Sequence, residues 1–306
     1  MKPSQLPPSG ADQHALVAYK GAEVRVDGRP LVAHLAERLR ASGGFGPIWI
    51  VGPRHVYEPL GVADAIVDTD KHLGANLRAA VEHFKANYAD GAMAFLACDV
   101  LPTVPELRDV AAHWQRDAER SDVWFPLVRV PEDPEELRAF AWKPEYRLIE
   151  EEGQEPTFIL PGHLIVANPR RLRMRLLYAV LDAAYRTRNR PIEKRKGPMA
   201  RAVFGDLLWH DLMHLLNFRK PDVTWTVLTS GLRIARKMRA GTITRAELER
   251  LGSAVVVRSR HLRKHPECGA RTPLVDALGL ARDVDTEEEA ADLARLHAAA
   301  ADGSEG

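Results

Sequence analysis

Short apolar runs alternate with amphipathic stretches in the first half of this 306-residue chain. A strand exposed on one face alternates apolar and polar residues, so a continuous apolar run indicates a strand buried on both faces. Such runs lie at 47–51, 65–67 and 92–98. Before the first run, residues 15–20 predict a short extended segment, and leucines recur every fourth residue from Leu31 to Leu39 up to a glycine-rich stop at 42–46. Between the last two runs, the apolar residues of 74–84 share one helical face. This alternation predicts an α/β fold with a mostly parallel, doubly wound sheet.

The second half of the chain has a different pattern. Residues 105–116 predict a helix, and 123–130 and 157–166 predict strands, the latter kinked at Pro161 and Gly162. Helical patterns then fill 169–251, 253–257 return to a strand pattern, and Thr286 and Glu289 have capping-box spacing at a last helix. The predicted parts are an α/β core at 14–168, an inserted helical segment or lid at 169–251, and a C-terminal strand and helix at 252–297 that complete the core.

Composition excludes several classes of protein. The formal net charge is only +1, which argues against a protein that binds nucleic acid over its whole surface. No apolar run approaches the roughly 18 residues that a membrane-spanning helix needs. The two cysteines, Cys98 and Cys268, give no disulfide framework, so we expect a reducing, cytoplasmic location. The oligomeric state stays open.

Acidic residues at the ends of predicted elements are the first candidates for chemistry. Asp99 follows the buried run 92–98, and ligands of open α/β sheets bind outside the carboxyl ends of the strands. Asp99 is therefore placed to hold a metal or a phosphate ligand, or else it only caps the turn before the next helix. Asp283 and Asp285 precede the last helix, where one of them could equally lead into its cap.

Basic residues are concentrated in one stretch. Between Arg170 and Arg201 there are eleven lysines or arginines and two acids. This stretch is interpreted as a basic lid over an anionic substrate, with a solvated helix face as the equal alternative. His261, His265 and Cys268 offer only three ligands for zinc, so a zinc site is disfavoured.

Several separated stretches together resemble the MobA-like nucleotidyltransferases, which have a glycosyltransferase-A-like fold of the nucleotide-diphospho-sugar transferase type. Lys20 and the turn at 26–31 resemble the family's lysine and its "G-[RK]-P-[LM]" turn. Residues 96–102 resemble the "CDxP" strand end, with one extra residue before the proline. Residues 158–168 resemble the strand that closes the acceptor pocket, and 282–289 resemble the closing "DxDTPEDL". The stretch 238–248 further resembles one uncharacterised branch of the family.

The resemblance implies an enzyme that transfers a nucleoside monophosphate from a nucleoside triphosphate to a small phosphorylated or hydroxylated, anionic acceptor, with release of pyrophosphate. It implies that Lys20 and Asp99 are catalytic, and that Mg²⁺, with Mn²⁺ as a substitute, is bound by Asp99 and Asp285, with Asp283 as the competitor of Asp285. Lys20, Asp99, Gly74 and Asn76 would bind the nucleotide, although Asn76 is equally well suited to cap a helix. Gly162, His163, Arg188 and Arg190 would bind the acceptor, although a strand bulge explains the first two almost as well.

One family feature has no match here. The family opens with a strand and a glycine-rich "LAGGxGxR" loop around the nucleotide phosphates, and residues 1–14 do not resemble them. We expect either a late start of the chain or loss of the loop. Two other functions therefore stay open, namely a non-catalytic nucleotide-binding or scaffolding protein and a nucleotide-sugar glycosyltransferase. The second normally carries Asp-x-Asp at the central strand end, whereas Leu101 stands two residues after Asp99.

Overall fold

The computed structural model describes residues 19–71, 73–141, 143, 145–187, 207, 211 and 223–302. The first described third of the chain comprises α1 (Lys20–Glu23), β1 (Arg25–Val26), β2 (Arg29–Pro30), α2 (Leu31–Ser42), β3 (Trp49–Gly52), α3 (Arg54–Tyr57), the 3-10 helix η2 (Glu58–Leu60), β4 (Ala65–Asp68) and α4 (Leu73–Asn87). Strands β1 and β2 form an antiparallel hairpin, and β3 pairs in parallel with β4. Helix α2 ends at Gly43 in the left-handed conformation, inside the glycine-rich stop predicted from the sequence.

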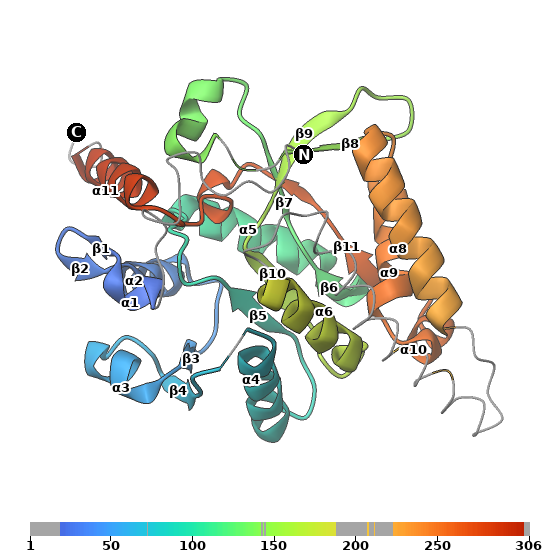
Figure 1. Ribbon diagram of the computed structural model, residues 1–306, viewed down its shortest axis with the longest axis horizontal. Coiled ribbons are helices and arrows are strands. Elements are labelled where there is room, and N and C mark those ends of the chain that lie inside the picture. Colours follow the sequence, from blue (N-terminus) through green and yellow to red (C-terminus); the bar gives the residue numbers. More distant parts are fainter. Residues whose placement is uncertain are drawn as a thin grey trace.

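Two four-stranded sheets form the centre of the molecule (Figure 1). Their strands are β5 (Met93–Leu96), β6 (Ser121–Trp124), β7 (Leu127–Arg129), β8 (Tyr146–Leu148), β9 (Thr157–Pro161), β10 (Leu164–Ala167), β11 (Gly269–Arg271) and β12 (Leu274–Val275). The strand orders are β11-β6-β10-β5 and β12-β7-β9-β8. Strand β10 runs antiparallel to both β5 and β6, whereas β11 is parallel to β6 and β12 to β7. The predicted α/β class is confirmed, and each four-stranded sheet contains parallel and antiparallel neighbours.

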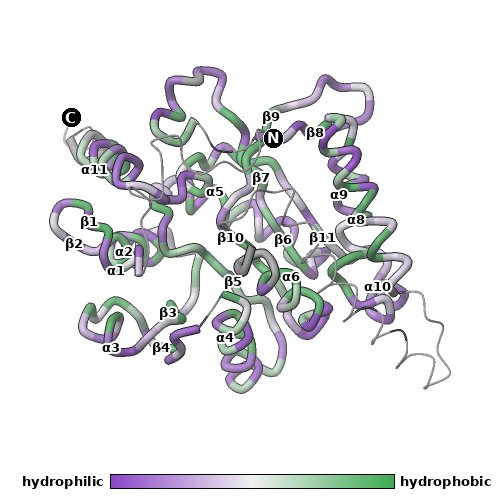
Figure 2. The backbone as a smooth tube through the Cα atoms, in the orientation of Figure 1, coloured by the Kyte–Doolittle hydropathy of each residue, from purple (hydrophilic) through white to green (hydrophobic). Residues whose placement is uncertain are grey.

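The remaining elements are helices that cover the sheets or flank them. They are α5 (Val104–Asp117), the 3-10 helices η3 (Ala118–Arg120), η4 (Pro134–Phe140) and η5 (Leu278–Leu280), α6 (Met174–Thr187), α8 (Val223–Ala240), α9 (Arg245–Val256), α10 (Ser259–Lys264) and α11 (Glu287–Asp302). Successive residues of β10 face opposite sides of the sheet. Val166 packs in one core cluster with Val110 of α5, and Ala167 packs in another with Val81 of α4 and Tyr178 of α6. Figure 2 shows that hydrophobic stretches concentrate in these central strands, while the loop between β8 and β9 is hydrophilic.

Three expectations about individual elements need correction. Residues 253–257 do not form a strand, because α9 continues to Val256 and its valines fill two apolar clusters, so tertiary packing outweighs their β propensity. Residues 123–130 form two strands, β6 and β7, separated at Phe125 and Pro126. Lys20 begins a short helix rather than lying in an extended segment. By contrast, the predicted interruption at Pro161 and Gly162 is confirmed, since β9 ends at Pro161 and β10 begins at Leu164.

Candidate active site

Strand β5 and the loop before α11 bring the predicted aspartates together. Asp99 follows β5, and its backbone oxygen accepts a hydrogen bond of 2.9 Å from the N–H of Val284. Val284 lies between Asp283 and Asp285, so this one bond places both side chains beside Asp99. Ligand atoms of the three aspartates lie within 4.8 Å of one another, and among the described residues no other cluster of three or more acidic, histidine or cysteine side chains is so close. His261 Nε2 lies 2.9 Å from Asp122 Oδ1, and His265 Nδ1 lies 3.6 Å from Glu267 Oε1.

Lys20 joins this cluster from the start of α1. Its Nζ lies 2.5 Å from Asp285 Oδ1 and 3.3 Å from Asp99 Oδ2. Helix α1 can approach this closely because Gly21 is buried against Cys98. A Cβ on Gly21 would lie 2.9 Å from the Cβ of Cys98, closer than real Cβ contacts. The glycine after the lysine is therefore needed for packing, and it was not singled out from the sequence.

Lys143 is a second lysine of the site, and sequence reasoning missed it. It follows η4 in an irregular segment and has no motif around it. Its Nζ lies 2.7 Å from Asp283 Oδ1, 3.2 Å from Asp285 Oδ2 and 3.5 Å from Glu289 Oε1. Only 8% of its side chain is exposed. The described contacts thus join four carboxylates to two ammonium groups, and negative charge stays in excess even when His163 is charged.

Glu289 links this cluster to the cap of α11. The predicted capping box is confirmed, because Glu289 N donates to Thr286 Oγ1 at 3.2 Å and Thr286 N donates to Glu289 Oε2 at 3.0 Å. The same oxygen accepts a bond of 2.5 Å from Asp285 N. Since Glu289 is 1% exposed, this buried carboxylate fixes the backbone of Asp285 and faces Lys143 with its second oxygen.

Charge and burial perturb the pKa values of these groups in opposite directions. Burial raises the pKa of Asp99, and the attraction of Lys20 offsets this effect only in part. Burial also acts to raise the pKa of Asp283, but the hydrogen bond and charge of His163 and the ammonium of Lys143 lower it overall. The pKa values of Lys20 and Lys143 are raised, because the nearby carboxylates outweigh the effect of burial. The negative charge of Asp283 is therefore well compensated by neighbouring cations, and that of Asp99 is compensated less.

The structure describes two of the four predicted acceptor-binding residues. Gly162 and His163 lie between β9 and β10, beside the aspartates. A Cβ on Gly162 would lie 2.7 Å from the backbone oxygen of Pro126, so this glycine permits close backbone packing. His163 Nε2 lies 3.2 Å from Asp283 Oδ1, and this contact raises the pKa of His163 although burial lowers it. Arg188 and Arg190 lie outside the described residues.

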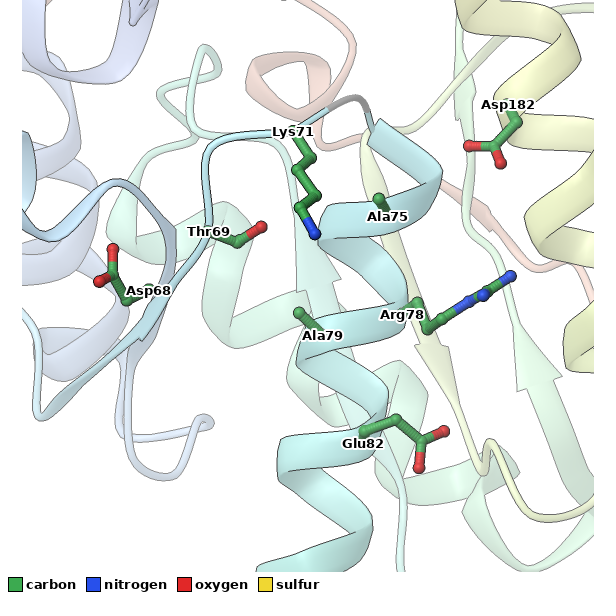
Figure 3. A pocket seen from close by; sticks show the side chains of 8 residues that line it. All are labelled: Asp68, Thr69, Lys71, Ala75, Arg78, Ala79, Glu82 and Asp182. Atoms are coloured by element: carbon green, nitrogen blue, oxygen red, sulfur yellow. The ribbon is translucent and has the colours of Figure 1, made fainter.

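A cavity of about 630 Å³ lies near the predicted nucleotide-binding glycine and asparagine. It is lined by Asp68, Thr69, Lys71, Ala75, Arg78, Ala79, Glu82 and Asp182. Figure 3 shows that these side chains come from the end of β4, from the loop that follows it, from α4 and from α6. Gly74 and Asn76 are not among them. A Cβ on Gly74 would lie 1.9 Å from Asp182 Oδ1, so Gly74 permits contact between α4 and α6. Asn76 Oδ1 accepts bonds of 3.0 Å from Thr69 Oγ1 and 3.2 Å from Lys71 N, and thereby closes the loop before α4.

Comparison with known proteins decides the family. The sequence model of the MobA-like NTP transferase domain matches residues 21–190, more than half of the chain. The chain belongs to this family. The predicted class of enzyme, a nucleotidyltransferase, is thereby confirmed.

Solved structures and curated proteins give further comparisons for this family member. It is similar to a structure described as a hypothetical transferase from Thermus thermophilus, with 22% identity, a TM-score of 0.52 and coverage of 90% of this chain and 91% of that one. A CMP:2-keto-3-deoxy-manno-octonic acid synthetase complexed with CTP shares 12% identity over 91% of each chain, with a TM-score of 0.44. The first similarity shows that the two chains share a fold over most of their length. No curated protein matches the chain. Within the described residues, no helix combines the length and the apolar character needed to cross a membrane.

Proposed function

We propose that this family member transfers a nucleoside monophosphate from a nucleoside triphosphate to a small phosphorylated or hydroxylated acceptor. In this reaction an acceptor oxygen forms a bond to the α-phosphorus while the bond from that phosphorus to the bridging oxygen breaks, and pyrophosphate leaves. The observation that carries the proposal is the convergence of Lys20 with Asp99, Asp283 and Asp285 at the end of β5. The family match and this constellation point to the same chemistry.

The donor set fits a divalent metal ion. Mg²⁺ takes oxygen ligands and is usually held by one or two carboxylates together with phosphate oxygens. The three aspartates supply carboxylate oxygens within 4.8 Å of one another, and burial raises the pKa of Asp99, so a cation would compensate its charge. Asp99 and Asp285 would hold the ion, with Mn²⁺ as a substitute. Such an ion orients the triphosphate and neutralises charge that develops on its oxygens.

We propose the remaining roles from the family resemblance and, where the structure describes the side chains, from their contacts. Lys20 is 20% exposed and is proposed to leave the carboxylates and pair with the triphosphate, where its ammonium offsets charge on the leaving group. Gly74 and Asn76 would shape the loop beside the nucleotide. His163, which lies 3.2 Å from Asp283 Oδ1, is proposed to contact the acceptor together with Gly162, Arg188 and Arg190.

The test is nucleotide-dependent release of pyrophosphate. Each of the four triphosphates is first screened with Mg²⁺ by thermal shift, and the one that binds is then incubated with mixtures of phosphorylated and hydroxylated acceptors. We expect pyrophosphate release that requires Mg²⁺. Asp99→Asn should abolish this release, because the charge that holds the ion is lost. Asp109→Asn, on the outer face of α5, is the control and should leave the release unchanged. Triphosphate binding without release from any acceptor would instead favour a non-catalytic nucleotide-binding protein.

A further inference from the structure

Asp283 and Asp285 differ in the cations that surround them. Lys143 Nζ contacts Asp283 twice, at 2.7 Å from Oδ1 and 2.7 Å from the backbone oxygen. His163 Nε2 lies 3.2 Å from the same Oδ1. Asp285 has Lys143 at 3.2 Å from Oδ2, whereas its Oδ1 faces Lys20. One oxygen of Asp283 is thus shared by two cationic groups of the protein.

The two lysines also differ in how firmly they are held. Lys20 is 20% exposed and reaches the cluster from a helix of four residues, so its long side chain can swing toward a bound anion. Lys143 is 8% exposed and has Asp283, Asp285 and Glu289 around its ammonium. Moving it would remove one cationic neighbour from each of these three carboxylates in a partly or fully buried place, which is costly.

The segment before Lys143 is anchored to α11. Arg138 has a φ of 47°, a conformation that a residue with a side chain rarely adopts. Its guanidinium lies 3.6 Å from Asp292 Oδ1, and Ala139 N donates to Asp292 Oδ2 at 3.3 Å. Asp292 is 1% exposed. Lys143 N then donates to Phe140 O at 3.0 Å. These contacts hold the end of η4 against α11, and Lys143 reaches the cluster just after that end.

We infer that Lys143 is a positioning residue that reserves Asp283 for itself and His163, and so leaves Asp99 and Asp285 as the protein ligands of the divalent cation. This inference rests on the proposed function. A cation ligated by Asp283 Oδ1 would lie beside the fixed ammonium group of Lys143, 2.7 Å away, and would be repelled by it, whereas a cation at Asp285 Oδ1 would take the place of the more exposed Lys20 ammonium. Lys143 thus decides which of three neighbouring carboxylates bind the ion.

Binding of Mn²⁺ alone to the full chain tests this inference, because the spectrum of Mn²⁺ reports its binding and its ligands without turnover. We expect Asp99→Asn and Asp285→Asn each to weaken binding by at least about tenfold, and Asp283→Asn by less than about threefold. In a Lys143→Met background Asp283 becomes free to ligate, so Asp283→Asn should then weaken binding by about tenfold. The spectrum should also show one fewer water on Mn²⁺ in Lys143→Met than in the unsubstituted protein.

The inference would be overturned if Asp283→Asn weakened Mn²⁺ binding equally in the unsubstituted and the Lys143→Met backgrounds. It would also be overturned if, in the unsubstituted protein, Asp283→Asn weakened Mn²⁺ binding as much as Asp285→Asn does. The second comparison needs no Lys143 variant and decides the matter even when Lys143→Met does not fold. Lys237→Met is the matched control, because it removes a lysine paired with Glu247 at 2.5 Å and should leave Mn²⁺ binding unchanged. Absence of Mn²⁺ binding by the unsubstituted protein would overturn the proposed metal site and the inference together, whereas equal Asp283→Asn effects would overturn only the inference.

Discussion

Replacing Glu289 by alanine should destabilise the protein strongly, because this carboxylate has at least three partners in a buried place. Its Oε2 accepts bonds from Asp285 N at 2.5 Å and Thr286 N at 3.0 Å, and its Oε1 lies 3.5 Å from Lys143 Nζ. The side chain is 1% exposed, so water does not reach the vacated acceptor position readily. The substitution leaves two backbone N–H groups and one ammonium group with a missing partner.

The expected loss follows from these three groups. An unsatisfied buried donor costs about 1 to 3 kcal/mol, and the buried N–H of Thr286 should lose that amount. The N–H of Asp285 is half-buried and should lose about 1 kcal/mol. Lys143 keeps Asp283 and Asp285, so its loss should also be about 1 kcal/mol. We therefore expect Glu289→Ala to lower the free energy of unfolding by about 3 to 5 kcal/mol. Glu289→Gln keeps an oxygen for both N–H groups and should cost about 1 to 2 kcal/mol.

Urea unfolding followed by tryptophan fluorescence measures this loss. The control is Glu288→Ala, which removes the same residue type from an exposed position one residue earlier and should change stability by less than about 0.5 kcal/mol. Because Glu289 also fixes the backbone of Asp285, Mn²⁺ binding should weaken by about tenfold in Glu289→Ala at temperatures where the protein stays folded. A loss within about 1 kcal/mol of the Glu288→Ala value would refute the assigned role of the buried carboxylate.

Three further predictions concern other contacts. Gly21→Ala should destabilise the protein by about 1 to 3 kcal/mol, because its Cβ would lie 2.9 Å from the Cβ of Cys98; an unchanged urea midpoint would contradict this. Gly74→Ala should cost a similar amount through its clash with Asp182, and thermal unfolding would measure it. Glu247 has a lowered pKa, because its hydrogen bond to Lys237 outweighs burial, so its stabilising effect should be present above about pH 4.5 and lost as pH falls through the lowered value. Glu247→Gln should therefore lower the free energy of unfolding at pH 7 but not near pH 3. An equal loss of stability at both pH values would contradict a stabilising ion pair between Glu247 and Lys237.

Local patterns in the sequence determined many elements before any contact was known. The leucine spacing and the glycine-rich stop predicted α2, and the capping-box spacing predicted the start of α11. These signals work because they involve residues within one or two turns of each other. The valines at 255–257 are the exception. Their β propensity is outweighed by apolar neighbours on other elements, which a local pattern does not contain.

For the candidate site, the sequence by itself indicated that Asp99 follows a strand and that Asp283 and Asp285 precede a helix. The family resemblance singled out Lys20, and the roles of all four residues remain predictions. Only the tertiary structure decided that Lys143 lies among Asp283, Asp285 and Glu289, and that Gly21 lets α1 approach Cys98. Lys143 carries no local signal, because its partners are about 140 residues away in the chain. Such a contact depends on how η4 is held against α11, and that arrangement is set by packing between distant elements rather than by the residues beside the lysine.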